Sequence, residues 1–119
     1  MSQSHVRTEM QGAVATLVID RPDKRNALDV ATRQQLIEAL GELRRNAAVR
    51  VVVITGSGKA FVSGADVGEF VGKNPVEILH DLRYGPGLIE VVDAFPKPVL
   101  AMINGYCLGS GNELAMACD

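Results

Sequence analysis

The sequence predicts an α/β fold built as one domain. Short runs of β-branched residues, which favour strands, alternate along the chain with segments whose apolar residues recur every three or four positions, the spacing of one helix face. Glycine and proline stand at most boundaries between these segments. A length of 119 residues is within the range of a single domain. The expected order of elements is β-β-α-β-α-β-α.

A β-hairpin is expected near the start of the chain. Residues 14–20 read Val-Ala-Thr-Leu-Val-Ile-Asp and predict a strand, which stops at Arg21-Pro22 because proline lacks the backbone donor that a central strand needs. The preceding segment, His5 to Met10, is expected to pair with this strand across a turn at Gln11-Gly12.

A helix and a strand are expected next. From Asp29 to Asn46 apolar residues recur at helical spacing, and Asp29 is the expected N-cap. The run Val51 to Ile54 is wholly β-branched and is followed by Thr55-Gly56-Ser57-Gly58. This pattern predicts a strand buried on both faces, as in a parallel sheet.

The last third of the chain predicts further helices and a strand. Two helical pieces are expected between Pro75 and Asp93, separated at Gly85-Pro86-Gly87. The run Val99 to Ile103 predicts another buried strand. A turn through the following glycines then leads into a final helix, expected from about Gly111 to Cys118.

Composition and charge exclude several classes of function. The 12 lysines and arginines are spread among 14 acidic residues, so no basic stripe is available for nucleic acid. The apolar runs are far shorter than the ~20 residues that span a bilayer, and the start lacks a secretion signal, so we expect a cytoplasmic protein without a membrane segment.

His5 and His80 stand apart from cysteines and acidic clusters, so no metal site is expected. Cys107 and Cys118 are expected to stay thiols.

Glycine-rich stretches beside predicted strands are the features that suggest chemistry. Gly109-Ser110-Gly111 precedes a helix, where backbone N–H groups could cradle an anion. It does not fit a dinucleotide fingerprint, because Leu114 stands where a third glycine is required. Gly58-Lys59 does not fit a P-loop, because Ala60 follows it in place of serine or threonine.

Two loops together suggest an oxyanion hole. Ser63–Asp66 and Leu108–Gly111 each follow a predicted strand, so each could direct a free backbone N–H at one shared point and stabilise negative charge on a carbonyl oxygen. Glu113 follows Ser110 by three residues, which on a helix returns it to the same side. The residues alone leave two plainer interpretations open. The glycines could only form turns, and Glu113 could be an exposed acid favoured by the helix dipole.

Three segments, in order, resemble the successive signatures of the enoyl-CoA hydratase/isomerase (crotonase) family. They are Asp20–Leu28 (DRPDKRNAL), Phe61–Val67 (FVSGADV) and Asn104–Asp119 (NGYCLGSGNELAMACD). The resemblance runs from about residue 14 to the last residue and covers about half of a family member. It implies a crotonase-like spiral of ββα units, truncated here, with residues 1–119 as the N-terminal part of the domain and its C-terminal half absent.

The resemblance also implies roles for residues of both loops. The backbone N–H groups of Ala65 and Ser110 would hold the thioester oxygen of an acyl-CoA, and Glu113 matches one of two glutamates that position and activate water. Asp66 is expected to fix its loop through local hydrogen bonds. Serine at position 110, where the family often has glycine, is tolerable if its backbone is not in a glycine-only conformation. The implied CoA-binding and substrate-binding residues are Ser63, Ala65, Asp66, Val67, Gly68 and Ser110.

The function that the resemblance implies is hydration of a 2-enoyl-CoA to a 3-hydroxyacyl-CoA, in fatty-acid or related acyl-CoA metabolism. No metal or redox cofactor is expected, because coenzyme A is part of the substrate. The family's second glutamate lies beyond Asp119, so these residues predict binding more firmly than turnover. The alternatives are another reaction of the family (isomerisation, thioester hydrolysis or decarboxylation) and a non-catalytic CoA-binding or assembly module. A homo-oligomer, trimeric or hexameric, is the implied assembly.

Overall fold

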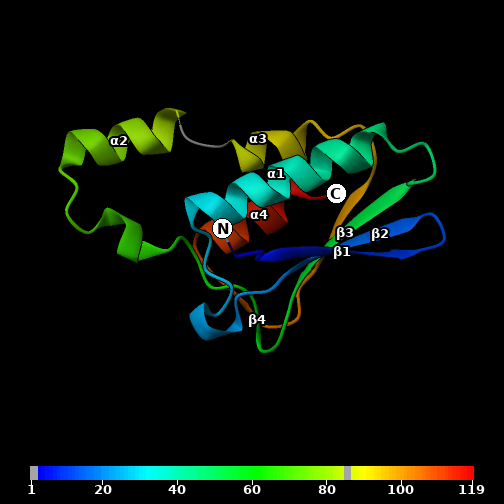
Figure 1. The fold of residues 1–119 in the computed structure, drawn as a ribbon, viewed down its shortest axis with the longest axis horizontal. Helices are drawn as coiled ribbons and strands as arrows, with labels where there is room; N and C mark the ends of the chain where they lie inside the picture. Colours follow the sequence, from blue (N-terminus) through cyan, green and yellow to red (C-terminus); the bar gives the residue numbers. More distant parts are fainter. Residues whose placement is uncertain (1–2, 85–86) are drawn as a thin grey trace.

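The computed structural model describes residues 3–84 and 87–119, which form a sheet with helices α1, α3 and α4 gathered on one side of it (Figure 1). The strands are β1 (Val6–Gln11), β2 (Val14–Ile19), β3 (Val51–Gly56), β4 (Ala60–Val62), β5 (Val99–Met102) and β6 (Tyr106–Cys107). The α-helices are α1 (Val30–Arg45), α2 (Pro75–Tyr84), α3 (Leu88–Asp93) and α4 (Ser110–Ala117). Two short 3-10 helices are η1 (Pro22–Lys24) and η2 (Val67–Phe70). The expected α/β class, and each expected helix and strand, are confirmed.

The main sheet has the strand order β1-β2-β3-β5. β1 and β2 form the expected antiparallel hairpin, and the turn between them is allowed by Gly12, whose φ is 59°. β2, β3 and β5 run parallel, with Leu17 opposite Ile54 and Ile54 opposite Ala101. Parallel strands end at the same edge of a sheet, so the segments that follow β3 and β5 leave from one edge.

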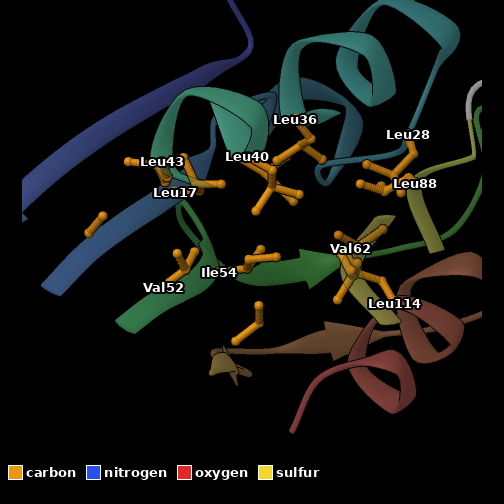
Figure 2. Close-up of a cluster of buried hydrophobic side chains, with 14 of the residues drawn as sticks. Leu17, Leu28, Leu36, Leu40, Leu43, Val52, Ile54, Val62, Leu88 and Leu114 are labelled. Atoms are coloured by element: carbon orange, nitrogen blue, oxygen red, sulfur yellow. The ribbon is translucent and has the colours of Figure 1, made fainter. Parts of the chain in front are cut away.

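Helix α1 is held at both ends by side chains. At its start the Asp29 carboxylate accepts a hydrogen bond from Thr32 N at 2.8 Å, which confirms the predicted N-cap. At its end the Lys97 ammonium donates to the Leu43 and Asn46 carbonyl oxygens at 2.7 and 2.8 Å. The apolar face of α1 packs onto the sheet in one continuous core (Figure 2), to which it contributes Leu36, Leu40 and Leu43.

Strand β5 differs from the prediction of a fully buried strand. Val99 is completely buried, but the side chains of Leu100 and Met102 are 47% and 54% exposed. The reason is position, because β5 is the edge strand of the described sheet and one of its faces is uncovered. β3, in the interior of the sheet, is closer to the prediction, with Val52 and Ile54 fully buried.

The segment between β4 and β5 holds the two expected helical pieces. Gly87 is the N-cap of α3, whereas Gly85 and Pro86, the rest of the predicted interruption, lie outside the described residues. Helix α2 projects away from the sheet, at the upper left of Figure 1. Its apolar side chains Val76 and Leu79 are 75% and 60% exposed, so α2 contributes little to the core.

Candidate active site

The two glycine-rich loops lie against each other because a small second sheet joins the strands before them. β4 and β6 pair in parallel, and Leu108 N continues the pairing by donating to Val62 O at 3.0 Å. A methyl group added at Gly109 would lie 3.7 Å from Gly64 Cα, which is ordinary van der Waals contact. The structure thus brings residues 63–66 and 108–111 into contact, as predicted.

Ala65 forms a short parallel backbone bridge with Leu28, and its own N–H takes no part in the hydrogen bonds of that bridge. Leu28 N donates to Gly64 O, and Asp66 N donates to Leu28 O, each at 2.9 Å. In a parallel bridge of this kind the two residues flanking Ala65 make the hydrogen bonds, so the N–H of Ala65 itself points away from Leu28. Ala65 N donates no hydrogen bond within residues 3–84 and 87–119.

The Ser110 amide is one of the unpaired donors at the start of α4. Gly109, with φ 54° and ψ −122°, is the N-cap and turns the chain into the helix. The neighbouring amides are used, since Gly111 N donates to Leu108 O at 2.8 Å and Glu113 N donates to Gly109 O at 3.1 Å. Ser110 N makes no such bond to any described residue. Helix starts leave such amides without intrahelical partners, so this one can receive an external acceptor.

Serine is accommodated at position 110. Ser110 is helical and is not among the residues with positive φ, so the condition set by the sequence is met. Its hydroxyl oxygen is buried and has no hydrogen-bond partner in the described chain. A buried hydroxyl without a partner is costly, so this side chain favours any ligand or segment that offers it an acceptor.

Glu113 lies in the first turn of α4 and is exposed. It borders a shallow hollow between α3 and α4, together with Glu90, Asp93 and Met116. The residues that line this hollow do not include Ala65 or Ser110. The structure therefore places the carboxylate one helical turn from the loop pair, on the surface beside α3.

The segment implied to bind coenzyme A, Ser63 to Gly68, contains the first loop and continues into η2. Ser63 is tied to the loop before it, because Ser63 N donates to Arg25 O at 3.2 Å. Asp66 accepts a hydrogen bond from Gly68 N at 3.1 Å and so caps η2, which confirms the prediction that it fixes its loop locally. Val67 is 72% exposed, which leaves its side chain available for a ligand.

Two asparagines that the sequence did not single out hold the start of β4. Asn26 is fully buried, accepts from Arg21 N at 2.8 Å, and donates to Ala60 O at 2.8 Å and Ser57 O at 3.0 Å. Asn104 donates to the same Ala60 carbonyl at 3.2 Å. The sequence offered one signal, since asparagine is among the few residues that tolerate a positive φ, and Asn26 has φ 58°.

The described residues hold neither a candidate metal cluster nor a membrane-spanning helix. No group of three or more histidine, cysteine, aspartate or glutamate side chains in residues 3–84 and 87–119 could hold a metal ion. No helix in this described part combines the length and the apolar character needed to cross a membrane. Cys107 and Cys118 are both free thiols, as expected.

Fold and loops together define a class of protein, an α/β chain in which two glycine-rich turns present unpaired backbone amides beside an acidic helix turn. Comparison with known proteins gives the family. The model of the enoyl-CoA hydratase/isomerase family matches residues 9–119, so the chain belongs to that family.

Individual relatives support the same family. The chain is 37% identical to a short-chain-enoyl-CoA hydratase of Clostridium acetobutylicum over its full length, and 40% identical to a 2,3-dehydroadipyl-CoA hydratase of Escherichia coli over 98% of it. The crystal structure of an enoyl-CoA hydratase from Bacillus anthracis superposes with a TM-score of 0.91 at 35% identity, covering 98% of this chain. The chain spans 46%, 45% and 46% of these three proteins, so it corresponds to about half of the crotonase fold.

Proposed function

We propose that the protein to which these residues belong adds water across the double bond of a 2-enoyl-CoA thioester, giving a 3-hydroxyacyl-CoA. The observation that carries the proposal is the contact between two loops whose Ala65 and Ser110 amides have no acceptor among the described residues. Membership of the enoyl-CoA hydratase/isomerase family, and relatives named as hydratases, support the substrate class.

The two amides supply the electrostatic part of the reaction. Addition of water to the β-carbon pushes negative charge onto the thioester oxygen, and two fixed N–H donors stabilise that charge in the transition state. Backbone donors held by a strand bridge and a helix start need little reorganisation when the charge appears. Residues Ser63 to Gly68 would bind the coenzyme A portion, and no metal or redox cofactor takes part.

Glu113 is proposed to position the water and accept its proton as the oxygen adds. The proton delivered to the α-carbon would come from a second acid, which we place outside residues 1–119. Because the chain spans about half of its relatives, this assignment concerns the whole protein. We further propose that the whole protein is a cytoplasmic homo-oligomer, a trimer or hexamer, which mass photometry would test.

A different reaction on the same scaffold is the main alternative. Isomerisation, thioester hydrolysis and decarboxylation of a CoA ester also pass through negative charge on the thioester oxygen, so the loop pair serves them equally. A carboxylate such as Glu113 could serve as base in several of these reactions, so the preference for hydration comes from the relatives named as hydratases. A non-catalytic CoA-binding module is the second alternative, and the intact mass of the protein from its source distinguishes it.

The direct test is a hydratase assay of the protein made from its complete coding sequence. With crotonyl-CoA, Glu113→Gln should lower kcat by about 100-fold or more, because general-base catalysis contributes at least that factor. The matched control is Glu90→Gln, which neutralises another exposed carboxylate at the same hollow and should leave kcat within about twofold. Unchanged activity in Glu113→Gln would remove the proposed role, and absence of hydration by the unaltered protein would remove the proposed reaction.

A further inference from the structure

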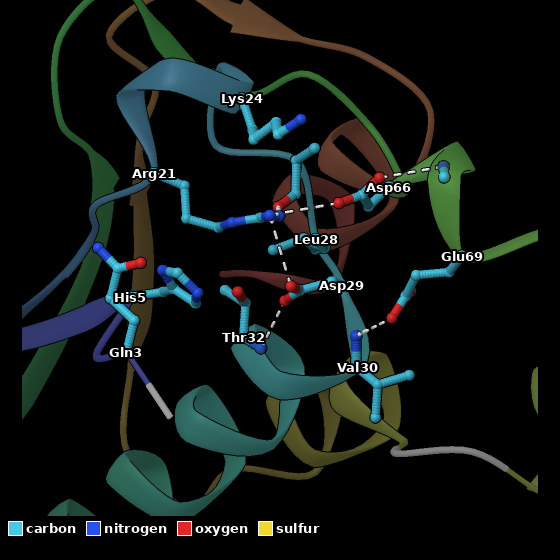
Figure 3. Close-up of polar contacts among 12 residues, drawn as sticks. Gln3, His5, Arg21, Lys24, Leu28, Asp29, Val30, Thr32, Asp66 and Glu69 are labelled. Atoms are coloured by element: carbon cyan, nitrogen blue, oxygen red, sulfur yellow. Dashed lines mark hydrogen bonds and ion pairs between the residues drawn. The ribbon is translucent and has the colours of Figure 1, made fainter. Parts of the chain in front are cut away.

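A buried arginine, Arg21, contacts the Ala65 loop through Asp66. Arg21 is only 9% exposed, and its guanidinium contacts three residues from two segments of the chain, among them Asp29 and Asp66 (Figure 3). It donates to Ala27 O at 2.6 Å and to Asp66 Oδ2 at 3.2 Å, and it lies 3.5 Å from Asp29 Oδ2. One cation therefore joins the segment before α1 to the loop that precedes η2.

These contacts surround the residues that orient the Ala65 amide. Ala65 is oriented by its bridge to Leu28, and Leu28 lies between Ala27 and Asp29, which both contact Arg21. On the other side of the bridge, Asp66 directly follows Ala65 and also contacts Arg21. The guanidinium thus holds the two backbone segments of the bridge at a set separation.

Both carboxylates that contact Arg21 also accept hydrogen bonds from backbone N–H groups. Their positions are therefore fixed, and another cation could not easily take the place of Arg21. Asp66 accepts from Gly68 N, and Asp29 accepts from Thr32 N, so each caps a helix while it contacts Arg21. Burial opposes ionisation of Asp29, but hydrogen bonding from Thr32 and the Arg21 charge outweigh it and hold the pKa of Asp29 below its ordinary value. Without Arg21, two partly buried carboxylates would face each other with no counter-charge between them.

We infer that Arg21 is a positioning residue of the active site, which sets the place of the Ala65 N–H through Asp66 and through the residues on either side of Leu28. The inference rests on the proposed function. Arg21 does not need to touch the substrate for this role. Its loss would let the Ala65 loop move relative to the Ser110 loop, which has its own supports in β6 and α4.

The expected consequence is a loss of kcat with little change in KM. A displacement of about 1 Å at a reacting group can cost on the order of 100-fold in rate, because stabilisation of the developing charge depends on donor geometry. Substrate binding is spread over the coenzyme A portion and depends less on one amide. Arg21→Gln should therefore lower kcat by about 10- to 100-fold and change KM by less than about threefold.

The experiment uses the protein from its complete coding sequence and crotonyl-CoA. Arg21→Gln is compared with Asp66→Asn, which keeps an oxygen for Gly68 N but removes the charge that Arg21 pairs with. The matched control is Lys97→Ala, which removes a cation that holds the other end of α1 far from the loops. Urea unfolding at the assay temperature gives the folded fraction, so that each kcat refers to folded protein.

A second measurement reports on the amide itself. The infrared carbonyl band of bound butyryl-CoA, labelled with carbon-13 at the thioester carbon, falls in frequency as hydrogen bonding to the oxygen strengthens. This saturated ligand is not hydrated, so the reading does not depend on turnover. Arg21→Gln and Asp66→Asn should raise the band towards its frequency in water, and Lys97→Ala should leave it at the wild-type value.

Each outcome decides the inference. The inference is supported if Arg21→Gln lowers kcat and raises the carbonyl band while Lys97→Ala does neither. If the arginine variant does not fold, the same two changes in Asp66→Asn support it. If wild type is active but the Arg21 and Asp66 variants match Lys97→Ala, Arg21 is only structural and the inference fails while the proposed function stands. If wild type neither binds nor hydrates the enoyl-CoA, the proposed function fails and the inference with it.

Discussion

The two loops of the candidate site meet at one place but are held there by different forces. In addition to its backbone hydrogen bonds with Leu28 and Arg25, the Ser63–Asp66 loop is held by charge, through the pair between Asp66 and buried Arg21. The Leu108–Gly111 loop is held by close backbone contact, because a methyl group at Gly111 would overlap the Val62 carbonyl oxygen and lie 2.9 Å from Val62 Cβ. One side of the proposed oxyanion hole should therefore respond to charge and pH, and the other to side-chain volume.

This difference has a mechanical consequence. Contacts between backbones without intervening side chains leave no room for adjustment, so the start of α4 is a fixed reference. An ion pair of side chains can lengthen without a clash, so the Ala65 loop is the adjustable partner. Substitutions that change side-chain volume should therefore damage the fold, whereas substitutions that change charge should damage mainly the site.

The largest effect is expected from Gly111→Ala. The added methyl would force α4 away from β4, and overpacking of this kind costs about 3 kcal/mol in the free energy of unfolding. The matched control is Gly41→Ala in α1, where the methyl would meet only the Arg45 guanidinium at 3.5 Å. Removing glycine from a helix interior should stabilise the protein by about 0.5–1 kcal/mol. Urea denaturation of both variants measures this, and equal effects would contradict the contact-held description of the second loop.

A smaller loss is expected from Gly109→Ala. The nearest atom to the new methyl would be Gly64 Cα at 3.7 Å, so there is space, but φ 54° with ψ −122° is a conformation that alanine avoids. Such backbone strain costs about 1–3 kcal/mol. Gly12→Ala, at a hairpin turn with φ 59° where no described atom lies within 4 Å of the new methyl, serves as a control for positive φ away from the site. If urea denaturation shows that Gly109→Ala does not lower the free energy of unfolding, the loop adopts another conformation.

Removal of the Asp29 carboxylate should have a moderate effect that depends on pH. Asp29→Ala loses the N-cap of α1, so at pH 7 the free energy of unfolding should fall by about 1 kcal/mol. The pKa of Asp29 is lowered from its ordinary value of 3.8, because hydrogen bonds from Thr32 and the Arg21 charge overcome the effect of burial. Its contribution is therefore complete above pH 3.8 and is lost as the pH falls through the lowered folded-state pKa.

The measurement is the difference in unfolding free energy between wild type and Asp29→Ala from pH 7 down to pH 2. The difference should stay constant at neutral pH and narrow only in acid. Asp29→Asn keeps an acceptor for Thr32 N without a titrating group, so its difference from Asp29→Ala should not depend on pH. A wild-type difference that is the same at every pH would show that the charge of Asp29, beside Arg21, does not stabilise the fold.

The smallest effect concerns Cys118, at the end of α4. Burial, reinforced by the negative charge of Asp119, raises the pKa of the Cys118 thiol to about 11. In a Cys107→Ser background, which leaves Cys118 as the one thiol of residues 1–119, iodoacetamide alkylation of Cys118 should accelerate about tenfold per pH unit from pH 7 to pH 10, because only the thiolate reacts. A rate that levels off below pH 9 would show that burial does not raise the pKa of the Cys118 thiol.

Local patterns predicted most of the fold. The hairpin, α1 with its Asp29 cap, and the order of the larger elements all follow from spacing and turn residues within short windows. β4 and β6 were missed because strands of three and two residues are too short to show a period. The exposure of β5 was missed because a strand sequence does not say whether the strand lies at the edge of its sheet.

The same distinction applies to the candidate site. The bond from Gly68 N to Asp66 spans two residues, and the sequence predicted it as a local turn. The pair between Arg21 and Asp66 spans 45 residues, and no local pattern indicates which distant acid an arginine will meet. The resemblance to the family implied roles for Ala65, Ser110 and Glu113, which stay predictions, but the supports that place Ala65 became visible only in three dimensions.

The most direct measurement of the central claim is a crystal structure of the protein from its complete coding sequence with butyryl-CoA bound. The thioester oxygen should accept hydrogen bonds from both Ala65 N and Ser110 N, each at about 2.7–3.1 Å. A thioester oxygen that contacts only one of these amides, or lies away from both, would contradict it.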